Sequence, residues 1–156
     1  MHLEIHMRLT RAGEYAVRCV LYLAAQRPGG VCNRKVIAKA MDIPDQFLGK
    51  IAQQLAHAGL IEVVQGSKGG LRLVRAPDKI SLLDVVEAVI GEIFLNDCML
   101  RSDSCDRSNS CAAHSVWEKA RNQLRATLSD ATFARLLHED KCLNPFKAET
   151  NTADQA

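Results

Sequence analysis

The chain has 156 residues, of which 47% are hydrophobic and only 4% aromatic. This length suits one small domain with an extension, and an apolar set made mainly of Ala, Leu, Val and Ile favours helices over a β-sandwich. The net charge is +2, but residues 1–80 hold twelve Lys and Arg against six Asp and Glu, while residues 81–156 hold eight against twelve. The first half therefore suits a polyanionic partner, and the second half a different task.

Neither a secretory signal nor a membrane span is expected, because the amino-terminal region is charged and no apolar run approaches about 20 residues. We therefore expect a cytoplasmic protein in a reducing compartment. There, cysteines favour metal binding or redox chemistry over structural disulfides. The six cysteines are Cys19, Cys32, Cys98, Cys105, Cys111 and Cys142.

Three helices are predicted in the first sixty residues. The first spans 10–26 with Thr10 as its N-cap, the second runs from about Asn33 to Ala40, and the third runs from Pro44 to about Ala58 with Gly59 beyond its end. Apolar spacing places one face of the second and third helices inward. The inward residues are Val36, Ile37, Ala40, Phe47, Leu48, Ile51, Leu55 and Ala58.

After residue 59 the spacing of the apolar residues changes from one typical of helices to one typical of strands. Residues 60–64 and 71–74 read as two strands joined by a glycine-rich basic turn, and Ser81 caps a further helix that ends at Gly91. A polar loop is expected over 96–111, followed by one long amphipathic helix over 112–137. The tail beyond Asp140 is expected to be disordered.

Helix, short helix, turn, helix and hairpin in this order predict a winged helix-turn-helix domain that binds double-stranded DNA. The third helix would enter the major groove, helix starts would meet phosphates, and the wing would reach the minor groove or the backbone. The candidate DNA-binding residues are Arg8, Thr10, Arg34, Lys35, Pro44, Asp45, Gln46, Gly49, Lys50, Gln65, Ser67, Lys68, Gly69 and Arg72.

Three cysteines in the polar loop form the second motif, Cys98-x₆-Cys105-x₅-Cys111, followed by x₂-His114. Soft thiolates suit iron–sulfur clusters and zinc, and zinc sites usually show closer cysteine pairs. The wider spacing favours a cluster, with a fourth ligand from elsewhere. Free loop thiols are the simpler alternative. Cys19 is expected in the core, and no role is assigned to Cys32 or Cys142.

With these motifs the sequence resembles the IscR/NsrR/RirA family of bacterial iron–sulfur transcription regulators. The resemblance covers roughly residues 7–138. It is carried by the cysteine triplet together with Met7–Thr10, Glu14–Arg18, Gly59–Ile61 and Gly66–Gly70.

The resemblance implies a homodimer formed through the long helix, and a 2Fe–2S or 4Fe–4S cluster on the three cysteines. Its fourth ligand would be His114, or Glu14 donated by the other subunit. The chain departs from the family pattern in one cysteine gap of six residues instead of five. It also has Gln65 in place of a wing arginine, and Pro44, Gln46 and Gly49 in the third helix, so the operator sequence cannot be transferred.

The fold class expected is therefore mainly α, with a winged helix-turn-helix domain, a β-hairpin wing and a long C-terminal dimerisation helix. The predicted parts are a DNA-binding domain over 7–80, a cluster loop and dimerisation helix over 81–138, and a disordered tail over 139–156.

The function expected is that of a repressor whose DNA affinity is controlled by an iron–sulfur cluster responding to nitric oxide, redox or iron status. The alternative is a winged-helix regulator that uses its cysteines as a thiol redox switch or a zinc site. No nucleophile–base pair points to an enzyme.

Overall fold

The computed structural model describes residues 10–101, 103–107 and 109–139. The first helices are α1 (Arg11–Ala24), α2 (Arg34–Ala40) and α3 (Asp45–His57), followed by strands β1 (Ile61–Val64) and β2 (Gly70–Leu73) and a short 3-10 turn, η1 (Pro77–Lys79). The remaining helices are α4 (Leu82–Ile90), α5 (Asp97–Leu100), α6 (Ala112–Asp130) and α7 (Phe133–Glu139). The chain is mainly helical with one antiparallel hairpin, as predicted.

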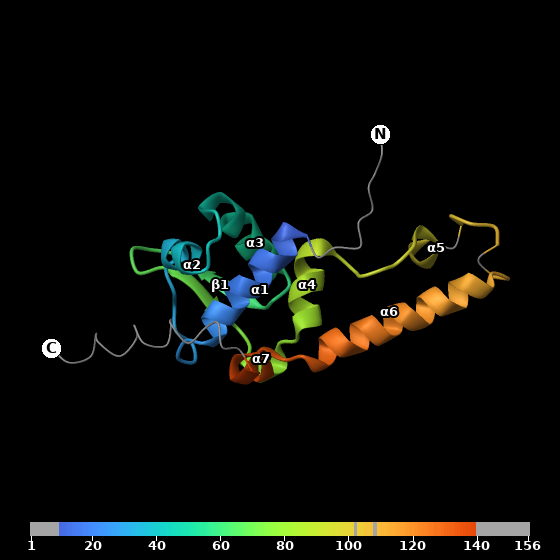
Figure 1. Cartoon of the computed structure of the whole chain (residues 1–156). Coiled ribbons are helices and arrows are strands. Elements are labelled where there is room, and N and C mark those ends of the chain that lie inside the picture. The colour runs from blue at the N-terminus through green and yellow to red at the C-terminus, as the bar shows by residue number, and fades with distance from the viewer. Residues whose placement is uncertain (1–9, 102, 108, 140–156) are drawn as a thin grey trace.

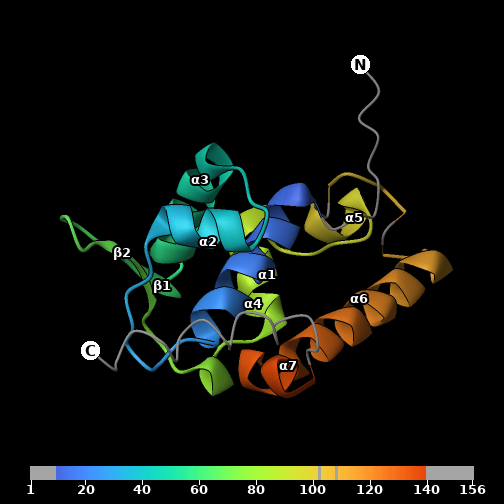
Figure 2. The same cartoon turned by 60° about the vertical axis from the view of Figure 1, so that its left-hand side comes forward.

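Two parts are visible in Figure 1. We call the part that contains α1–α4, the hairpin and α7 the body. The segment 92–130, with α5 and α6, projects from it, and we call this segment the arm. Figure 2 shows α6 running away from the body, starting beside α7. The arm therefore carries the three-cysteine loop at the end remote from the hairpin.

The core of the body surrounds α1, which packs against α3, α4 and α7. Thr10 begins α1 by accepting a hydrogen bond from the Gly13 amide at 3.3 Å, as its sequence position predicts. Cys19 and Val20 are fully buried on its inner face. Ser81 and Asp84 form a reciprocal capping box that begins α4.

The hairpin is joined to the rest of the body by a bridge between Cys32 and Leu71. The Cys32 amide donates to the Leu71 carbonyl at 2.9 Å, and the Leu71 amide donates to the Cys32 carbonyl at 2.8 Å. A Cβ atom on Gly70 would lie 2.1 Å from the Cys32 carbonyl oxygen. The bridge therefore requires glycine at this position, which gives the wing glycines a structural role.

The prediction of a single long helix over 112–137 is wrong, because the helix is interrupted at Ala131 and Thr132. There the Ala131 carbonyl accepts from Leu82 at 2.8 Å, and the Phe133 amide donates to Ile80 at 2.9 Å. These bonds return the chain to the body and bury Phe133 completely. Burial of a phenylalanine outweighs the lost helical continuity.

Other sequence predictions also need correction. Val36 and Phe47 were expected inward, yet they are 52% and 47% exposed, and Ala58 is exposed as well. Phe47 lies at the edge of the buried face, where its ring packs on Tyr15 with centroids 6.1 Å apart. The cysteine loop is not irregular throughout, since it begins with the short helix α5. The predicted tail lies largely outside the described residues.

Candidate DNA interface and cysteine loop

The candidate DNA-binding residues of the body come from the start of α2, the start of α3 and the hairpin. Asp45, Gln46 and Lys50 are exposed on α3, and Gln65 and Lys68 are exposed at the hairpin tip. Pro44 is the N-cap of α3 rather than its first helical residue. Arg8 lies outside the described residues, and Thr10 is exposed at the start of α1.

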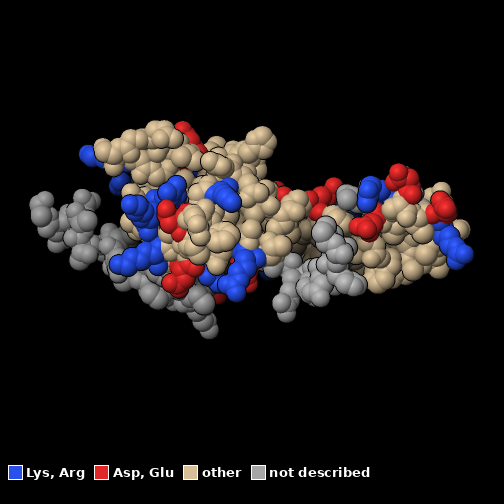
Figure 3. All heavy atoms as spheres, turned by 90° about the horizontal axis from the view of Figure 1, so that it is seen from above, with Lys and Arg blue, Asp and Glu red and all other residues tan. Residues whose placement is uncertain are grey.

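Basic side chains gather on the body more than on the arm. Seen from above, Lys and Arg cluster over the end that holds α2, α3 and the hairpin, whereas the remote end of the arm mixes basic with acidic groups (Figure 3). A groove between the start of α2 and the hairpin is lined by Arg34, Lys35, Gln65 and Gly69, among others. The structure thus brings the predicted α2 and wing residues to one surface suited to a polyanion.

Two arginines of this surface are held by carboxylates. Arg34 donates to Asp45 through two hydrogen bonds of 3.1 Å, which link the first residues of α2 and α3. Arg72 pairs with Glu62 across the hairpin at 2.8 Å, in register with the strand pairing. Neither pairing was foreseen in the sequence, because the partners lie about ten residues apart and meet only through the fold.

Two further arginines, which the sequence pattern did not reveal, stabilise the ends of helices in the helix-turn-helix. Arg18 donates to the Met41 carbonyl at 3.3 Å and lies 5.7 Å from the centre of the Tyr15 ring. Arg75 donates to the carbonyls of Ala58 and Gly59 at the end of α3. A positive charge at a helix C-terminus is stabilising, and this preference was the available signal.

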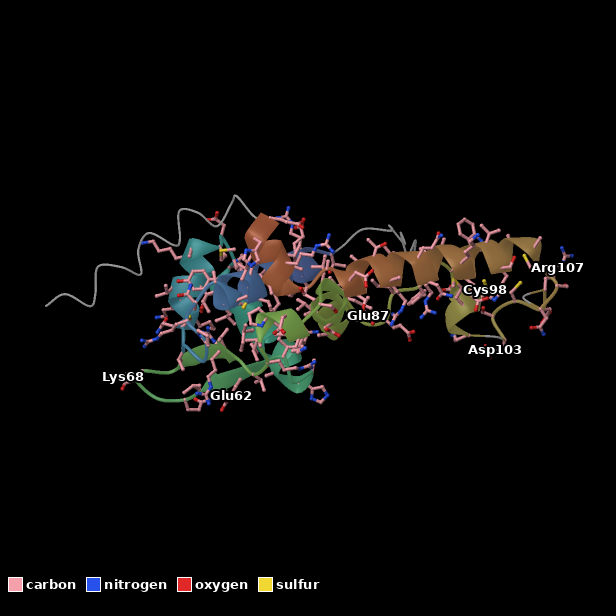
Figure 4. The ribbon with its side chains drawn as sticks, turned by 90° about the horizontal axis from the view of Figure 1, so that it is seen from below. Glu62, Lys68, Glu87, Cys98, Asp103 and Arg107 are labelled. Atoms are coloured by element: carbon pink, nitrogen blue, oxygen red, sulfur yellow. The ribbon has the colours of Figure 1, made fainter. Side chains whose placement is uncertain are left out.

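In the arm, the three cysteines differ in exposure. Cys98 on α5 is half-buried, while Cys105 and Cys111 are exposed. Figure 4 places Cys98 at the end of the molecule opposite Lys68, close to the loop that carries Asp103 and Arg107. Within the described residues no three His, Cys, Asp or Glu side chains are gathered closely enough to hold a metal ion.

His114 lies in the first turn of α6, where its amide donates to the Cys111 carbonyl at 3.1 Å. Its Nδ1 atom is buried and has no hydrogen-bond partner among the described residues. Such an atom usually has a partner, so its lone pair or proton is available to a ligand. Glu14, the other candidate fourth ligand, is exposed in the first turn of α1.

Two arginines of α6 hold the base of the arm, one through α4 and one through the segment that follows α4. Arg125 forms an ion pair with Glu87, and Arg121 pairs with Glu92 and donates to the Ile93 carbonyl at 2.7 Å. Figure 4 shows Glu87 between the two ends of the molecule, at the base of α6.

The same region of α4 is also linked to α3. Gln54 donates from α3 to the Val89 carbonyl at 3.2 Å. Polar contacts therefore connect α6 with α4, and α4 with the helix expected to read DNA.

The two cysteines of the body have an environment unlike those of the loop. Burial raises the pKa of the Cys19 thiol to about 12, and burial also raises the pKa of Cys32. Raised values keep both groups protonated and unreactive at neutral pH. Cys19 is a core residue, as predicted.

A basic helix-turn-helix with a hairpin wing defines the class, a winged-helix DNA-binding protein. The chain belongs to the Rrf2 family, described as iron-dependent transcriptional regulators, whose family model matches residues 9–139. It is therefore a transcriptional regulator rather than an enzyme. No helix in the described part of the chain has both the length and the apolar character needed to cross a membrane.

Individual proteins agree with this assignment. The chain is 33% identical to protein aau3 of Rhizobium meliloti, over 94% of this chain and all of that protein. It is 30% identical to the regulator NsrR of Bacillus subtilis, over 84% of this chain and 90% of that one.

Solved structures share the fold. CymR, the global cysteine regulator of B. subtilis, matches with a TM-score of 0.72 at 21% identity, over 87% of this chain and all of that one. IscR of T. potens matches with a TM-score of 0.66 at 24% identity, over 97% and 96% of the two chains.

Proposed function

We propose that this regulator holds an iron–sulfur cluster on Cys98, Cys105 and Cys111, and that the state of this group controls its affinity for DNA. The observation that carries the proposal is the arm itself, where three thiols and an imidazole with an unpartnered buried nitrogen lie within 17 residues. Soft thiolates with one nitrogen are a ligand set that iron–sulfur clusters accept. The family description as iron-dependent, and the relative named NsrR, support it.

The protein residues have separate tasks in this proposal. The thiolates hold the group, and the loop between them must close around it, because the described side chains are not yet gathered. When bound, the cluster supplies reactivity toward nitric oxide and oxidants, together with sensitivity to iron supply. Arg125 then connects a change in the loop to α4 through Glu87, and Gln54 connects α4 to α3.

His114 is the fourth ligand that we favour, because its Nδ1 is buried without a partner while Glu14 is exposed on the body. Glu14 would act only across a dimer, from the other subunit. The two choices predict different spectra. His114→Ala should shift the visible absorption of the cluster and speed its loss, while Glu14→Ala leaves both unchanged. The reverse result would assign the ligand to Glu14 and place the cluster between subunits.

A homodimer formed through α6 is part of the proposal. None of the 19 residues of α6 is buried in the single chain, and Val116, Trp117 and Leu124 on one stripe are 61%, 42% and 38% exposed. An apolar stripe of this kind on a helix is normally covered by a partner. A two-fold pair of α6 helices would set the separation of the two α3 helices, and so the fit to successive major grooves. We also propose that the protein is cytoplasmic and that it acts as a repressor.

The test is anaerobic purification of the full chain, followed by visible absorption and measurement of iron, sulfide and zinc per chain. We expect a coloured protein that becomes colourless in each of the variants Cys98→Ala, Cys105→Ala and Cys111→Ala. Cys32→Ala is the matched control, because it removes a thiol from the body and should leave the colour unchanged. A colourless wild type with one zinc per chain would overturn the cluster.

A thiol switch is the second candidate, favoured by the exposure of Cys105 and Cys111 and by the fold shared with a cysteine regulator. In this case peroxide would oxidise two exposed thiols to a disulfide, with the peroxide reduced to water. DNA affinity would then change with peroxide and recover with a thiol reductant, in protein that contains no iron.

A further inference from the structure

The ion pair between Arg34 and Asp45 joins α2 to α3 on the expected DNA surface. The Nε atom of Arg34 donates to Oδ1 of Asp45, and Nη2 donates to Oδ2, both at 3.1 Å. The two side chains are 46% and 47% exposed. An exposed pair of this kind contributes little to stability. Stability is therefore a weak reason for a two-point geometry that joins the first residues of α2 and α3.

The guanidinium of Arg34 lies beside Gly49, a position of α3 that has no side chain. A Cβ atom on Gly49 would stand 3.4 Å from Nη1 of Arg34. Gln46 precedes Gly49 by three residues and Gln53 follows it by four, so these residues are neighbours on one face of the helix. Both are exposed, while Leu48 and other residues of the opposite face are buried. Arg34 therefore supplies, from α2, a side chain to the outer face of α3 where α3 itself has none.

We propose that Arg34 reads a base in the major groove and that Asp45 is its positioning residue. Asp45 occupies the edge of the guanidinium formed by Nε and Nη2. The other edge, formed by Nη1 and the second hydrogen of Nη2, is the pair of donors that matches O6 and N7 of guanine. In this proposal Arg34 contacts a base and Asp45 does not. Their positions in the sequence had suggested a phosphate contact for Arg34 and a base contact for Asp45.

The carboxylate of Asp45 has a physical reason to act through Arg34. A free carboxylate at the start of the recognition helix would repel the phosphates on either side of the groove. Paired with Arg34 it is neutralised, and it fixes a side chain with many rotamers in one orientation. Because less conformational freedom is then lost on binding, the preference for guanine is strengthened. The proposal rests on the DNA-binding function of the family.

The test is selection of duplexes from a randomised DNA library with the full-length protein, for wild type, Arg34→Ala and Asp45→Asn. Wild type should select guanine at one position of each half-site. Both variants should lose that preference at the same position, by about 5- to 150-fold, the value of one bidentate base contact. The double variant should lose no more than either single one. Lys35→Ala, outside the pair, should weaken binding to all duplexes alike.

A further variant keeps both charges and moves the guanidinium. Gly49→Leu would occupy the space under Nη1 and should abolish the same preference, with helical circular dichroism unchanged. Loss of preference at a different position in Asp45→Asn would overturn the proposal, because Asp45 would then contact a base itself. Equal weakening of all duplexes by Arg34→Ala would also overturn it. A wild type that selects no sequence would instead contradict sequence-specific DNA binding itself.

Discussion

The body and the arm bury their residues very differently. The body has a continuous core that includes Leu48, Leu55 and Phe133, all fully buried, whereas none of the 19 residues of α6 is buried. The fold of the body is therefore stabilised by its own hydrophobic core. Under the proposed function the arm is stabilised in addition by contacts from outside the chain, which a second copy along α6 or a group bound by its cysteines would supply. Substitutions should accordingly affect stability in the body and assembly or ligand retention in the arm.

The largest expected loss of stability comes from Phe133→Ala, which would show that α7 belongs to the body. Phe133 is completely buried and follows the break that ends the arm. Its truncation should lower the free energy of unfolding by about 3–5 kcal/mol, measured by urea denaturation. Phe94→Ala, at a site that is 37% exposed in the arm, is the matched control. Equal effects of the two substitutions would contradict the distinction between body and arm.

Gly70→Ala should follow in size. A Cβ at this position meets backbone atoms of Cys32 that cannot move without breaking the bridge to the hairpin. A loss of about 1–3 kcal/mol is expected, as for other overpacked sites. In contrast, Gly49→Ala places its Cβ in ordinary contact and should stabilise α3 by up to about 1 kcal/mol. Thermal melting of both variants checks the opposite signs.

Arg125→Met removes one partner of a mostly buried ion pair at the junction of the two parts. Glu87 is 21% exposed and also accepts a hydrogen bond from the Ile93 amide at 3.0 Å. Loss of its partner should cost about 1–2 kcal/mol. Under the proposed function it should also reduce the change in DNA affinity on cluster loss, with the visible absorption of the cluster unchanged. The double variant Glu87→Gln with Arg125→Met should recover part of the stability, since no unpaired charge remains.

Val116→Asp tests the arm with little change in the stability of the single chain. The residue is 61% exposed, so the expected loss is below about 0.5 kcal/mol. Sedimentation should nevertheless shift from dimer to monomer, because the substitution places a charge in the apolar stripe. Glu118→Asp, at a polar exposed position of the same helix, should remain dimeric. A wild type that sediments as a monomer would contradict the proposed assembly.

The ionisation of Cys19 has no effect on stability at neutral pH and is expected to act only at high pH. Its pKa is raised to about 12 in the folded protein from an ordinary value of 9.0. The unfolded chain therefore loses this proton first, and the stability contributed below pH 9 is lost as the pH rises toward 12. Cys19→Ala should make the free energy of unfolding fall less steeply over this range. Parallel curves for the two proteins would show that the thiol does not titrate as expected.

The sequence predicted what depends on local chemistry. Thr10 and Ser81 were expected to be caps because their side chains can bond helix-start amides, and both do so. Burial at helix edges was harder to predict. Phe47 has the helical spacing typical of a core residue, but it is 47% exposed and its ring packs on Tyr15 at the edge of the buried face. The break after α6 was missed because it depends on hydrogen bonds to residues about fifty positions earlier, which periodicity cannot reveal. The Arg34–Asp45 pair was missed for the same reason, at shorter range.

The return of the chain to the body at Phe133 has a consequence for the order of synthesis. The arm is an insertion between Gly91 and Ala131, and the core is complete only when Phe133 has joined it. On the ribosome, all three loop cysteines therefore emerge before the DNA-binding body can close. A nascent chain that stops within α6 carries the thiols but an open core. The body therefore reaches its full core only after the whole arm has been synthesised.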